Sequence, residues 1–211
     1  MTACPQVLPG LPDVEGLQKG WSVTTPPASW RLSVFAGRLC EISGSHAAAS
    51  LTLVFRLVLE TQRRDEPAVW VSRRESVFFP PDAAAVGVDL RALAVVWVGD
   101  MRLAARAADF LVRSGAFGLV VLDLGARARL PVAAQSRLVG LAKKHDTALV
   151  CITEKNNDRA SLGSLVSIRA EAVRAQKTDD RFRCEARILK DKRRGPGWTH
   201  TEVCHGPDGL R

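Results

Sequence analysis

The sequence contains no tyrosine, and aromatic residues make up only 6% of its 211 positions. No apolar run approaches the roughly 18 residues that a membrane-spanning helix needs. The longest run, around residues 116–124, has the length of a strand. The N-terminus also lacks the basic and then apolar segment of an export signal. These absences predict a cytoplasmic protein that does not span a membrane.

Patterns typical of metal and disulfide chemistry are missing too. The cysteines are scattered, odd in number and without a Cys-x-x-Cys pair; they are Cys4, Cys40, Cys151, Cys184 and Cys204. The four histidines show no metal-binding spacing. This usage fits a reducing cytosol better than a disulfide framework or a zinc site. Because Ser, Cys and His occur only as isolated residues, the sequence offers no candidate for nucleophilic catalysis.

What the chain does have is a basic balance. Hydrophobic residues make up 46% of the sequence and the mean hydropathy is near zero, which is typical of a globular protein. The formal net charge is +8 and the isoelectric point is about 9.8. A basic chain favours polyanionic partners, nucleic acid first. The alternative is an arginine-rich proteome encoded by a GC-rich genome, which would raise the charge without a partner.

Composition and hydrophobic period divide the chain. Residues 1–34 are rich in Pro and Gly and predict an extended arm, whereas residues 35–211 predict one core domain. In the core, short apolar runs predict strands buried on both faces of a parallel sheet. The expected strands cover residues 39–43, 68–72, 93–98, 119–122 and 148–153, with helices from residue 48 and over 100–114 and 131–144.

The hydrophobic period then changes to two. Residues 164–174 and 181–190 alternate, and the turn Gly195-Pro196-Gly197 leads to a third alternating segment, 198–204. In the helix 100–114 we expect Leu103, Ala107, Phe110 and Leu111 to form the apolar face. The pattern as a whole predicts an α/β fold, with a mostly parallel sheet flanked by helices and antiparallel strands at the C-terminal end.

Five segments carry a resemblance to a known family. They are GRLCEISG, AVWVSRRESVFFPPDAAAVGVDLRAL, FLVRSGAFGLVVLD, TALVCITEK and RILKDKRRGPGWTHTEV. In this order they closely resemble the core of bacterial RecA recombinase, over about residues 35–205. The chain looks like a shortened, degenerate RecA relative of the ImuA type, a mutagenesis accessory encoded beside error-prone polymerase components. The cell-division inhibitor SulA is a second RecA-like branch of similar size. The resemblance implies a RecA-like core.

The segment that resembles the phosphate-binding loop lacks the residues that hold a nucleotide. Such loops need glycines, a lysine that reaches the outer phosphates and a Ser or Thr hydroxyl on Mg²⁺. Aligned without gaps, Ala49 stands at the second glycine, Ser50 at the lysine and Leu51 at the hydroxyl. Thr52 could serve only after a shift in register. We therefore expect neither ATP nor Mg²⁺ to bind. The degenerate loop comprises Gly44, Ser45, His46, Ala49, Ser50, Leu51 and Thr52.

Three carboxylates match active-site positions of the family in type. Glu75 falls where the resemblance places the water-activating glutamate. Asp123 ends a buried strand, like the second metal-site carboxylate, and Glu154 stands where the family has a nucleotide-sensing glutamine. Without the phosphate lysine we expect all three to be vestigial. Two structural alternatives are that Asp123 caps the next segment and that Glu75 pairs with Arg73 or Arg74.

The segment Lys190-Asp191-Lys192 matches a further motif of the family. There, a Lys-x-Lys at this strand end reaches the ATP of the neighbouring subunit in the filament. A chain that keeps these lysines but lacks its own nucleotide loop could dock on an ATP-loaded RecA protomer and offer no site to the next one. It would then cap the filament, because a head-to-tail assembly stops where one face is missing. The alternative is a solvated basic hairpin.

Positive charge is concentrated around this segment. Residues 181–194 hold seven Lys or Arg residues against two acids, which predicts a ridge suited to phosphates. The ridge comprises Arg181, Arg183, Arg187, Lys190, Lys192, Arg193 and Arg194. Lys155 and Arg159 follow the last parallel strand, where the family's DNA-binding loop emerges, and we expect them to contribute to partner or DNA binding.

The sequence therefore predicts a non-enzymatic RecA-like accessory protein of DNA-damage-induced mutagenesis, associated with the nucleoid. By resemblance its partners would be RecA, a Y-family polymerase-like protein of the ImuB type and an error-prone replicative-type polymerase, with DNA as a further candidate. Two alternatives remain. One is a SulA-like inhibitor that binds the tubulin-like division protein, and the other is a residual ATPase.

Overall fold

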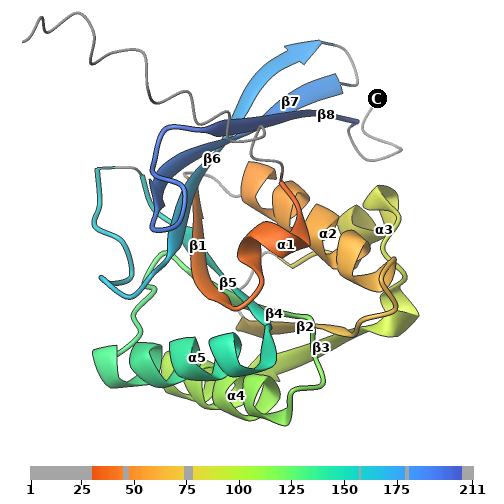
Figure 1. The fold of residues 1–211 in the computed structure, drawn as a ribbon. Coiled ribbons are helices and arrows are strands. Elements are labelled where there is room, and N and C mark those ends of the chain that lie inside the picture. The colour runs from red at the N-terminus through yellow and green to blue at the C-terminus, as the bar shows by residue number, and fades with distance from the viewer. Residues whose placement is uncertain (1–29, 45–47, 74–77, 157, 179–180, 206–211) are drawn as a thin grey trace, which may run out of the picture.

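The computed structural model describes residues 30–44, 48–73, 78–156, 158–178 and 181–205, which form one sheet with helices on both faces (Figure 1). Its strands are β1 (Arg38–Gly44), β2 (Ala68–Arg73), β3 (Leu93–Val98), β4 (Leu119–Gly125), β5 (Ala148–Glu154), β6 (Ile168–Thr178), β7 (Arg181–Asp191) and β8 (Thr199–His205). The helices are α1 (Leu32–Phe35), α2 (Ala48–Gln62), α3 (Pro80–Val86), α4 (Met101–Ser114) and α5 (Val132–His145), with a 3-10 turn, η2 (Leu90–Ala92). None of these helices is long and apolar enough to cross a membrane.

The strands follow one another across the sheet in the order β3-β2-β4-β5-β1-β6-β7-β8. From β3 to β6 all neighbours run parallel, and β7 and β8 then add antiparallel strands. Helices α4 and α5 lie together on one face of the parallel part, and α1, α2 and α3 lie on the other (Figure 1). The predicted fold class, a mostly parallel sheet with C-terminal antiparallel strands, is confirmed.

The pleat of each strand divides its side chains between two cores. In β1, Cys40 and Ile42 face the core on the α2 side, whereas Leu39 faces the core beneath α4 and α5. This explains why the central strands read as continuous apolar runs, since both of their faces are covered. In β7, Phe182 and Cys184 face α2 and are buried, as the period of two predicts.

One predicted strand has a different environment. The run LAVVWV, expected to be buried on both faces, forms β3 at the edge of the sheet, and 53% of the Trp97 side chain is exposed. The expectation of two-sided burial is therefore wrong for this strand. An apolar run reports strand propensity but does not distinguish a central strand from an edge strand.

The buried face of α4 also differs from the expected one. Ala104, Ala108 and Val112 are buried, whereas Leu103 and Phe110 are 40% and 61% exposed. Small side chains let the helix backbone approach the sheet and α5 closely, so the helix turns its alanine stripe inward. The prediction that Leu103 and Phe110 face the core is therefore wrong, because it considered the hydrophobicity of the side chains but not their size.

The core begins earlier than the composition suggests. Trp30 is buried and its indole Nε1 donates to the Leu53 carbonyl at 3.0 Å, while Phe35 in α1 is fully buried. Residues 30–34, which composition assigns to the arm, are thus part of the core. The rest of the arm, residues 1–29, lies outside the described residues, so its extended character stays a prediction.

Candidate functional site

A cavity of about 440 Å³ opens where the parallel strands end, and it is lined by residues from β2, β4 and β5. Asp123 and Glu154, two of the three carboxylates predicted from the resemblance, both line it. Asp123 is buried and Glu154 is exposed. Arg73 and Arg127 add positive charge to the wall of the cavity. Glu75, the third carboxylate, lies outside the described residues, as do Ser45 and His46 of the degenerate loop.

The start of α2 is packed with short, buried side chains. Ala49, Ser50 and Leu51 are exposed by only 4%, 3% and 7%. The Ser50 hydroxyl lies so close to Gly44 that a Cβ atom at Gly44 would sit 2.9 Å from it. The position aligned with the phosphate lysine therefore carries a small hydroxyl that packs against Gly44, and no positive charge.

Thr52 does not replace the missing metal-binding hydroxyl. Its side chain hydrogen-bonds to Cys184 in β7, so it faces the antiparallel strands. Within residues 48–52, the described start of the helix carries no Lys or Arg, and its two hydroxyls, Ser50 and Thr52, contact Gly44 and Cys184.

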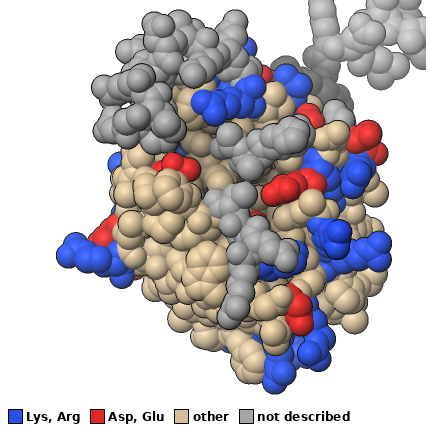
Figure 2. Space-filling model, turned by 180° about the vertical axis from the view of Figure 1, so that it is seen from behind, with Lys and Arg blue, Asp and Glu red and all other residues tan. Residues whose placement is uncertain are grey.

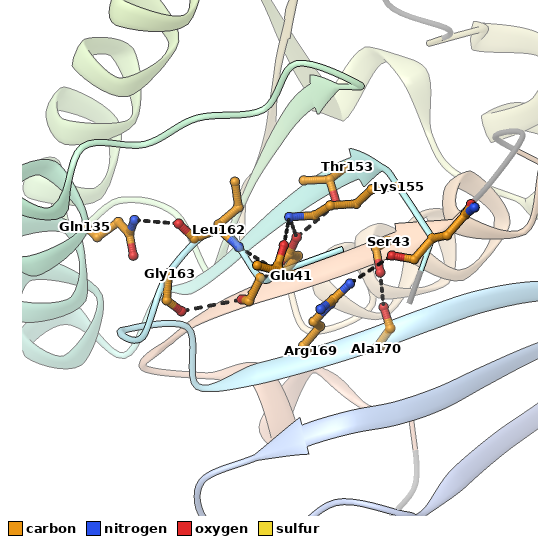
Figure 3. A network of polar contacts seen from close by, with 12 residues as sticks. Glu41, Ser43, Gln135, Thr153, Lys155, Leu162, Gly163, Arg169 and Ala170 are labelled. Atoms are coloured by element: carbon orange, nitrogen blue, oxygen red, sulfur yellow. Dashed lines mark hydrogen bonds and ion pairs between the residues drawn. The ribbon is translucent and has the colours of Figure 1, made fainter. Parts of the chain in front are cut away.

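Glu41 in β1 is a buried charged residue that the sequence reading did not single out. Its carboxylate is fully buried and accepts four hydrogen bonds. Oε1 accepts from Lys155 Nζ at 2.6 Å and from Thr153 Oγ1 at 3.1 Å, and Oε2 accepts from Ser161 Oγ at 2.7 Å and from the Leu162 amide at 2.9 Å. Figure 3 shows Glu41 at the centre of this network.

The network holds the segment that follows β5. Burial alone would raise the pKa of Glu41, but the hydrogen bonds from Lys155, the Leu162 amide and Ser161 hold it below its ordinary value. The carboxylate is thus charged, as its partner Lys155 requires. Gln135 of α5 donates to the Leu162 carbonyl at 3.0 Å and Arg169 of β6 donates to the Asn156 carbonyl at 3.1 Å. Residues 155–163 are therefore tied to three elements of the core (Figure 3).

Lys155 must be removed from the predicted binding surface. Its side chain is only 10% exposed, and its ammonium group donates to Glu41 and to the Ala160 carbonyl at 2.8 Å. A buried carboxylate requires such a partner, and this requirement fixes Lys155 inside the fold. Arg159, from the same segment, is exposed and remains a candidate. In the sequence, the feature that could have indicated this buried pair is Glu41 itself, an acid inside the otherwise apolar strand RLCEISG.

A second buried ion pair supports the Lys-x-Lys segment. Asp191, between the two lysines, accepts from Arg38 at 2.5 Å, and both side chains are almost fully buried. Asp191 also accepts from the Arg193 amide at 2.9 Å and from the Trp198 indole at 3.3 Å. Burial alone would raise the pKa of Asp191, but the Arg38 hydrogen bond and the Arg193 amide hold it below its ordinary value.

The buried position of Asp191 makes the exposed ridge more positive than the residue count implies. Arg183, Arg187, Lys192, Arg193 and Arg194 are exposed. Of the two acids in residues 181–194, Asp191 is buried, so Glu185 alone lies near these exposed basic side chains. The Arg181 side chain lies outside the described residues. Figure 2 shows Lys and Arg side chains along one flank of the face in view, with Asp and Glu side chains among them, beside a broad uncharged area.

The two lysines of the segment differ in environment. Lys192 is exposed, whereas Lys190 is half-buried and its Nζ donates to the Ser164 carbonyl at 3.2 Å. Burial lowers the pKa of Lys190, and repulsion from Lys192 lowers it further. The two lysines flank Asp191 in the sequence, and the carboxylate of Asp191 is paired with Arg38. Of the remaining ridge residues, Arg187 is paired with Glu185 at 2.9 Å.

Comparison with known proteins identifies relatives among the recombinases. The RecA protein of Aquifex aeolicus is 28% identical over 180 residues, which cover 75% of this chain and 51% of the relative. The RecA protein of Synechococcus sp. strain CC9605 is 34% identical over 122 residues, or 53% of this chain and 32% of the relative. The chain is a partial relative of RecA proteins.

A third RecA protein, from Herpetosiphon aurantiacus, is 31% identical over 137 residues, which are 56% of this chain and 38% of the relative. The chain thus spans about half the length of these curated relatives or less. No model of a protein family matches it. The parallel sheet of the described fold agrees with the RecA relationship.

Proposed function

We propose that this chain is a non-catalytic RecA-like accessory protein of the ImuA type, which acts in DNA-damage-induced mutagenesis by binding RecA and error-prone polymerase components. The observation that supports the proposal is the start of α2, where the positions aligned with the second glycine, the lysine and the metal-binding hydroxyl carry Ala49, Ser50 and Leu51, all buried. A hydrogen bond to a charged group contributes about 1.5–3 kcal/mol, and a phosphate lysine makes several of them. Without them a triphosphate would bind this site weakly.

The residual ATPase is the competing reading, because Arg73 and Arg127 line the cavity at the strand ends. Two arginines could attract a phosphate, but attraction alone does not position an attacking water or Mg²⁺. Of the two hydroxyls at the start of α2, Ser50 packs against Gly44 and Thr52 is engaged with Cys184. These contacts favour a scaffold that keeps the strand-to-helix connection for folding.

The face that carries Lys190 and Lys192 is the proposed RecA-docking face. Asp191, which separates the lysines in sequence, is buried against Arg38, so it does not neutralise them. Lys192 extends into solvent and Lys190 lies beside it, half-buried. Such a pair can contact the anionic ATP of a RecA protomer. The chain would then offer no loaded nucleotide site to the following protomer, and the filament would end there.

Filament length tests this proposal directly. RecA filaments are assembled on single-stranded DNA with ATP, the protein is added, and filament length and strand exchange are measured. The unmodified protein should shorten the filaments, and the K190E/K192E variant should not. The K143E/K144E variant is the matched control, because it reverses two exposed lysines at the end of α5 and changes the net charge equally.

Two results would contradict the proposal. One is a filament length that does not change with the unmodified protein. The other is an equal effect of both charge-reversal variants, which would indicate attraction by net charge without a docking face. A pull-down with RecA separates the same proposal from a SulA-like inhibitor, which would bind the tubulin-like division protein and leave RecA unbound.

A further inference from the structure

A groove between α4 and α5 contains a second cavity, of about 420 Å³. It lies between the middle of α4 and the first half of α5, and it shares no lining residue with the cavity at the strand ends. Figure 1 shows both helices at the bottom of the view, whereas β7, which carries the basic ridge, lies at the top. The groove is therefore separate from the cavity of the candidate site and from the proposed RecA-docking face.

The groove is lined mainly by apolar side chains, and the largest of them is exposed. Five of its eight lining residues are apolar: Ala105, Phe110, Ala133, Ala134 and Leu138. Phe110 is 61% exposed. Leu103, which is also exposed, precedes it by about two helical turns and so lies on the same stripe of α4. Exposed apolar side chains that gather beside a cavity are typical of a site that binds another protein.

Both helices are basic. Together they carry six Lys or Arg residues against one acid, Asp109. The Asp109 carboxylate pairs with Arg113 at 2.9 Å and with Arg137 at 2.5 Å, so two positive charges compensate it. The Arg106 guanidinium lies 5.9 Å from the centre of the Phe110 ring and forms no ion pair with a described residue. The rim of the groove thus keeps a positive charge, which favours an acidic partner.

The backbone around the groove favours a helical partner over an extended one. An extended peptide binds by adding a strand to an open sheet edge, but the backbone groups in the middle of α4 and α5 are already bonded within their helices. A helix satisfies its own backbone and binds through side chains at positions i, i+3, i+4 and i+7. Since α4 and α5 have 14 residues each, the groove between them is at most about 21 Å long, or about four helical turns.

We propose that the groove between α4 and α5 binds an acidic amphipathic helix of a protein partner. An apolar side chain of that helix enters the cavity beside Phe110, and carboxylates on either side of it face Arg106 and Arg137. Asp109 holds the Arg137 guanidinium by an ion pair, so this group is positioned before the partner arrives. Binding removes the exposed Phe110 ring from water, which supplies the apolar part of the affinity.

This inference goes beyond the proposed function and does not rest on it. Lys190 belongs to β7, on another part of the molecule, so one molecule can bind an acidic helix and a second partner at the same time. The K190E/K192E variant should therefore bind the acidic helix as the unmodified protein does. A variant of the groove should in turn leave the effect on RecA filament length unchanged.

Selection from a peptide display library tests the proposal with a defined probe. The library carries random peptides of about 16 residues, which is enough for about four helical turns. The full-length protein is the bait, and the F110S/R106E variant is used to remove peptides that bind elsewhere. The selected peptides should contain several Asp or Glu residues, and apolar residues spaced by three or four.

Variants of single residues then measure the contribution of the groove. The affinity of a selected peptide, measured by fluorescence anisotropy, should fall by about tenfold or more in F110S and in R106E. It should stay unchanged in the matched controls F79S and R91E, because Phe79 and Arg91 are also exposed but do not line the groove. Phe110 and Arg106 are exposed, so their substitution should leave the melting temperature unchanged.

Amide chemical shifts of the unmodified protein locate the bound peptide without any variant. The changes should centre on residues 105–110 and 133–138, and changes outside α4 and α5 would overturn the proposal. So would a selection that yields no peptide, or only peptides without acids or without the helical spacing. An equal loss of affinity in F110S and F79S would overturn it as well.

Two other occupants of the groove are outcomes of the same experiments. A dT oligonucleotide that binds more weakly to R106E but equally well to F110S, with no peptide selected, would assign the rim to nucleic acid. A dimer of the unmodified protein that dissociates in F110S, measured by sedimentation, would assign the groove to a second copy of this chain. Either result would contradict the proposed helix.

Discussion

Replacing Glu41 by Gln tests the structural role of the network that holds residues 155–163. All four partners of the Glu41 carboxylate are donors: the Lys155 ammonium, the Thr153 and Ser161 hydroxyls and the Leu162 amide. The Gln amide has one acceptor oxygen, so in either orientation its NH₂ group faces two donors. The hydroxyl on that side can rotate and accept from the NH₂ group. The Lys155 ammonium or the Leu162 amide cannot accept, so at least one hydrogen bond is lost, and Lys155, which is 10% exposed, loses its counter-charge.

The magnitude follows from the burial of this ion pair. Removing one partner of a buried pair costs about 3–5 kcal/mol, because the remaining charge is left uncompensated. This is a large part of the roughly 5–15 kcal/mol that stabilises a typical domain. The double variant E41Q/K155M removes the uncompensated charge as well, and we expect a coupling energy of about 1–3 kcal/mol in the double-mutant cycle.

Urea unfolding followed by tryptophan fluorescence measures both values, since Trp30 and Trp70 are buried. Arg64→Gln is the matched control. Arg64 pairs with Glu60 at 2.6 Å with 41% of its side chain exposed, and its loss should change stability by no more than about 1 kcal/mol. If E41Q unfolds at the same urea concentration as R64Q, the inference that Glu41 fixes the segment after β5 is wrong. Hydrogen exchange at the Leu162 amide should also quicken in E41Q.

Three further predictions concern the second ion pair, acid and nucleic acid. Asp191→Asn should destabilise the fold by about 3–5 kcal/mol, because buried Arg38 loses its counter-charge; a melting temperature equal to that of the unmodified protein would contradict this. The folded pKa values of Glu41 and Asp191 lie below their ordinary values of 4.5 and 3.8, so their contribution is complete above about pH 4.5 and is lost as the pH falls through the folded values. The unfolding free energy should therefore fall below that pH, and less steeply in E41Q; a decline of equal slope in both proteins would count against the assignment. If the ridge contacts single-stranded DNA, R193E/R194E should reduce the slope of log affinity against log salt by about 1.4, for two phosphate contacts; an unchanged slope would place the contact elsewhere.

The sequence predicted the parallel part of the fold because its central strands are buried on both faces. Runs such as LVVL in β4 and ALVCIT in β5 have the length of strands and are apolar on both faces. The edge position of β3 was not predicted, because an apolar run does not reveal whether the strand pairs with one neighbouring strand or with two. The inward stripe of Ala104 and Ala108 was missed as well, because a ranking by hydrophobicity does not consider how closely two backbones approach.

Charged residues were the least predictable part of the site. The sequence shows that Lys155 and Asp191 are charged, but not that each is buried against a residue more than a hundred positions away. Glu41 and Arg38, their partners, lie in β1 and become adjacent only when β1 inserts between β5 and β6. Asp123 and Glu154, by contrast, were singled out through the family resemblance, and they line one cavity because parallel strands end at the same edge of the sheet.

The most direct test of the account is titration calorimetry of the full chain with ATP and Mg²⁺. The central claim is that the segment of residues 44–52 has a structural role and does not bind a nucleotide. The account predicts no saturable heat up to millimolar ATP, with RecA as the positive control under the same conditions. A saturable one-to-one titration with micromolar affinity, weakened by substitution of Ser50 or Asp123, would contradict it.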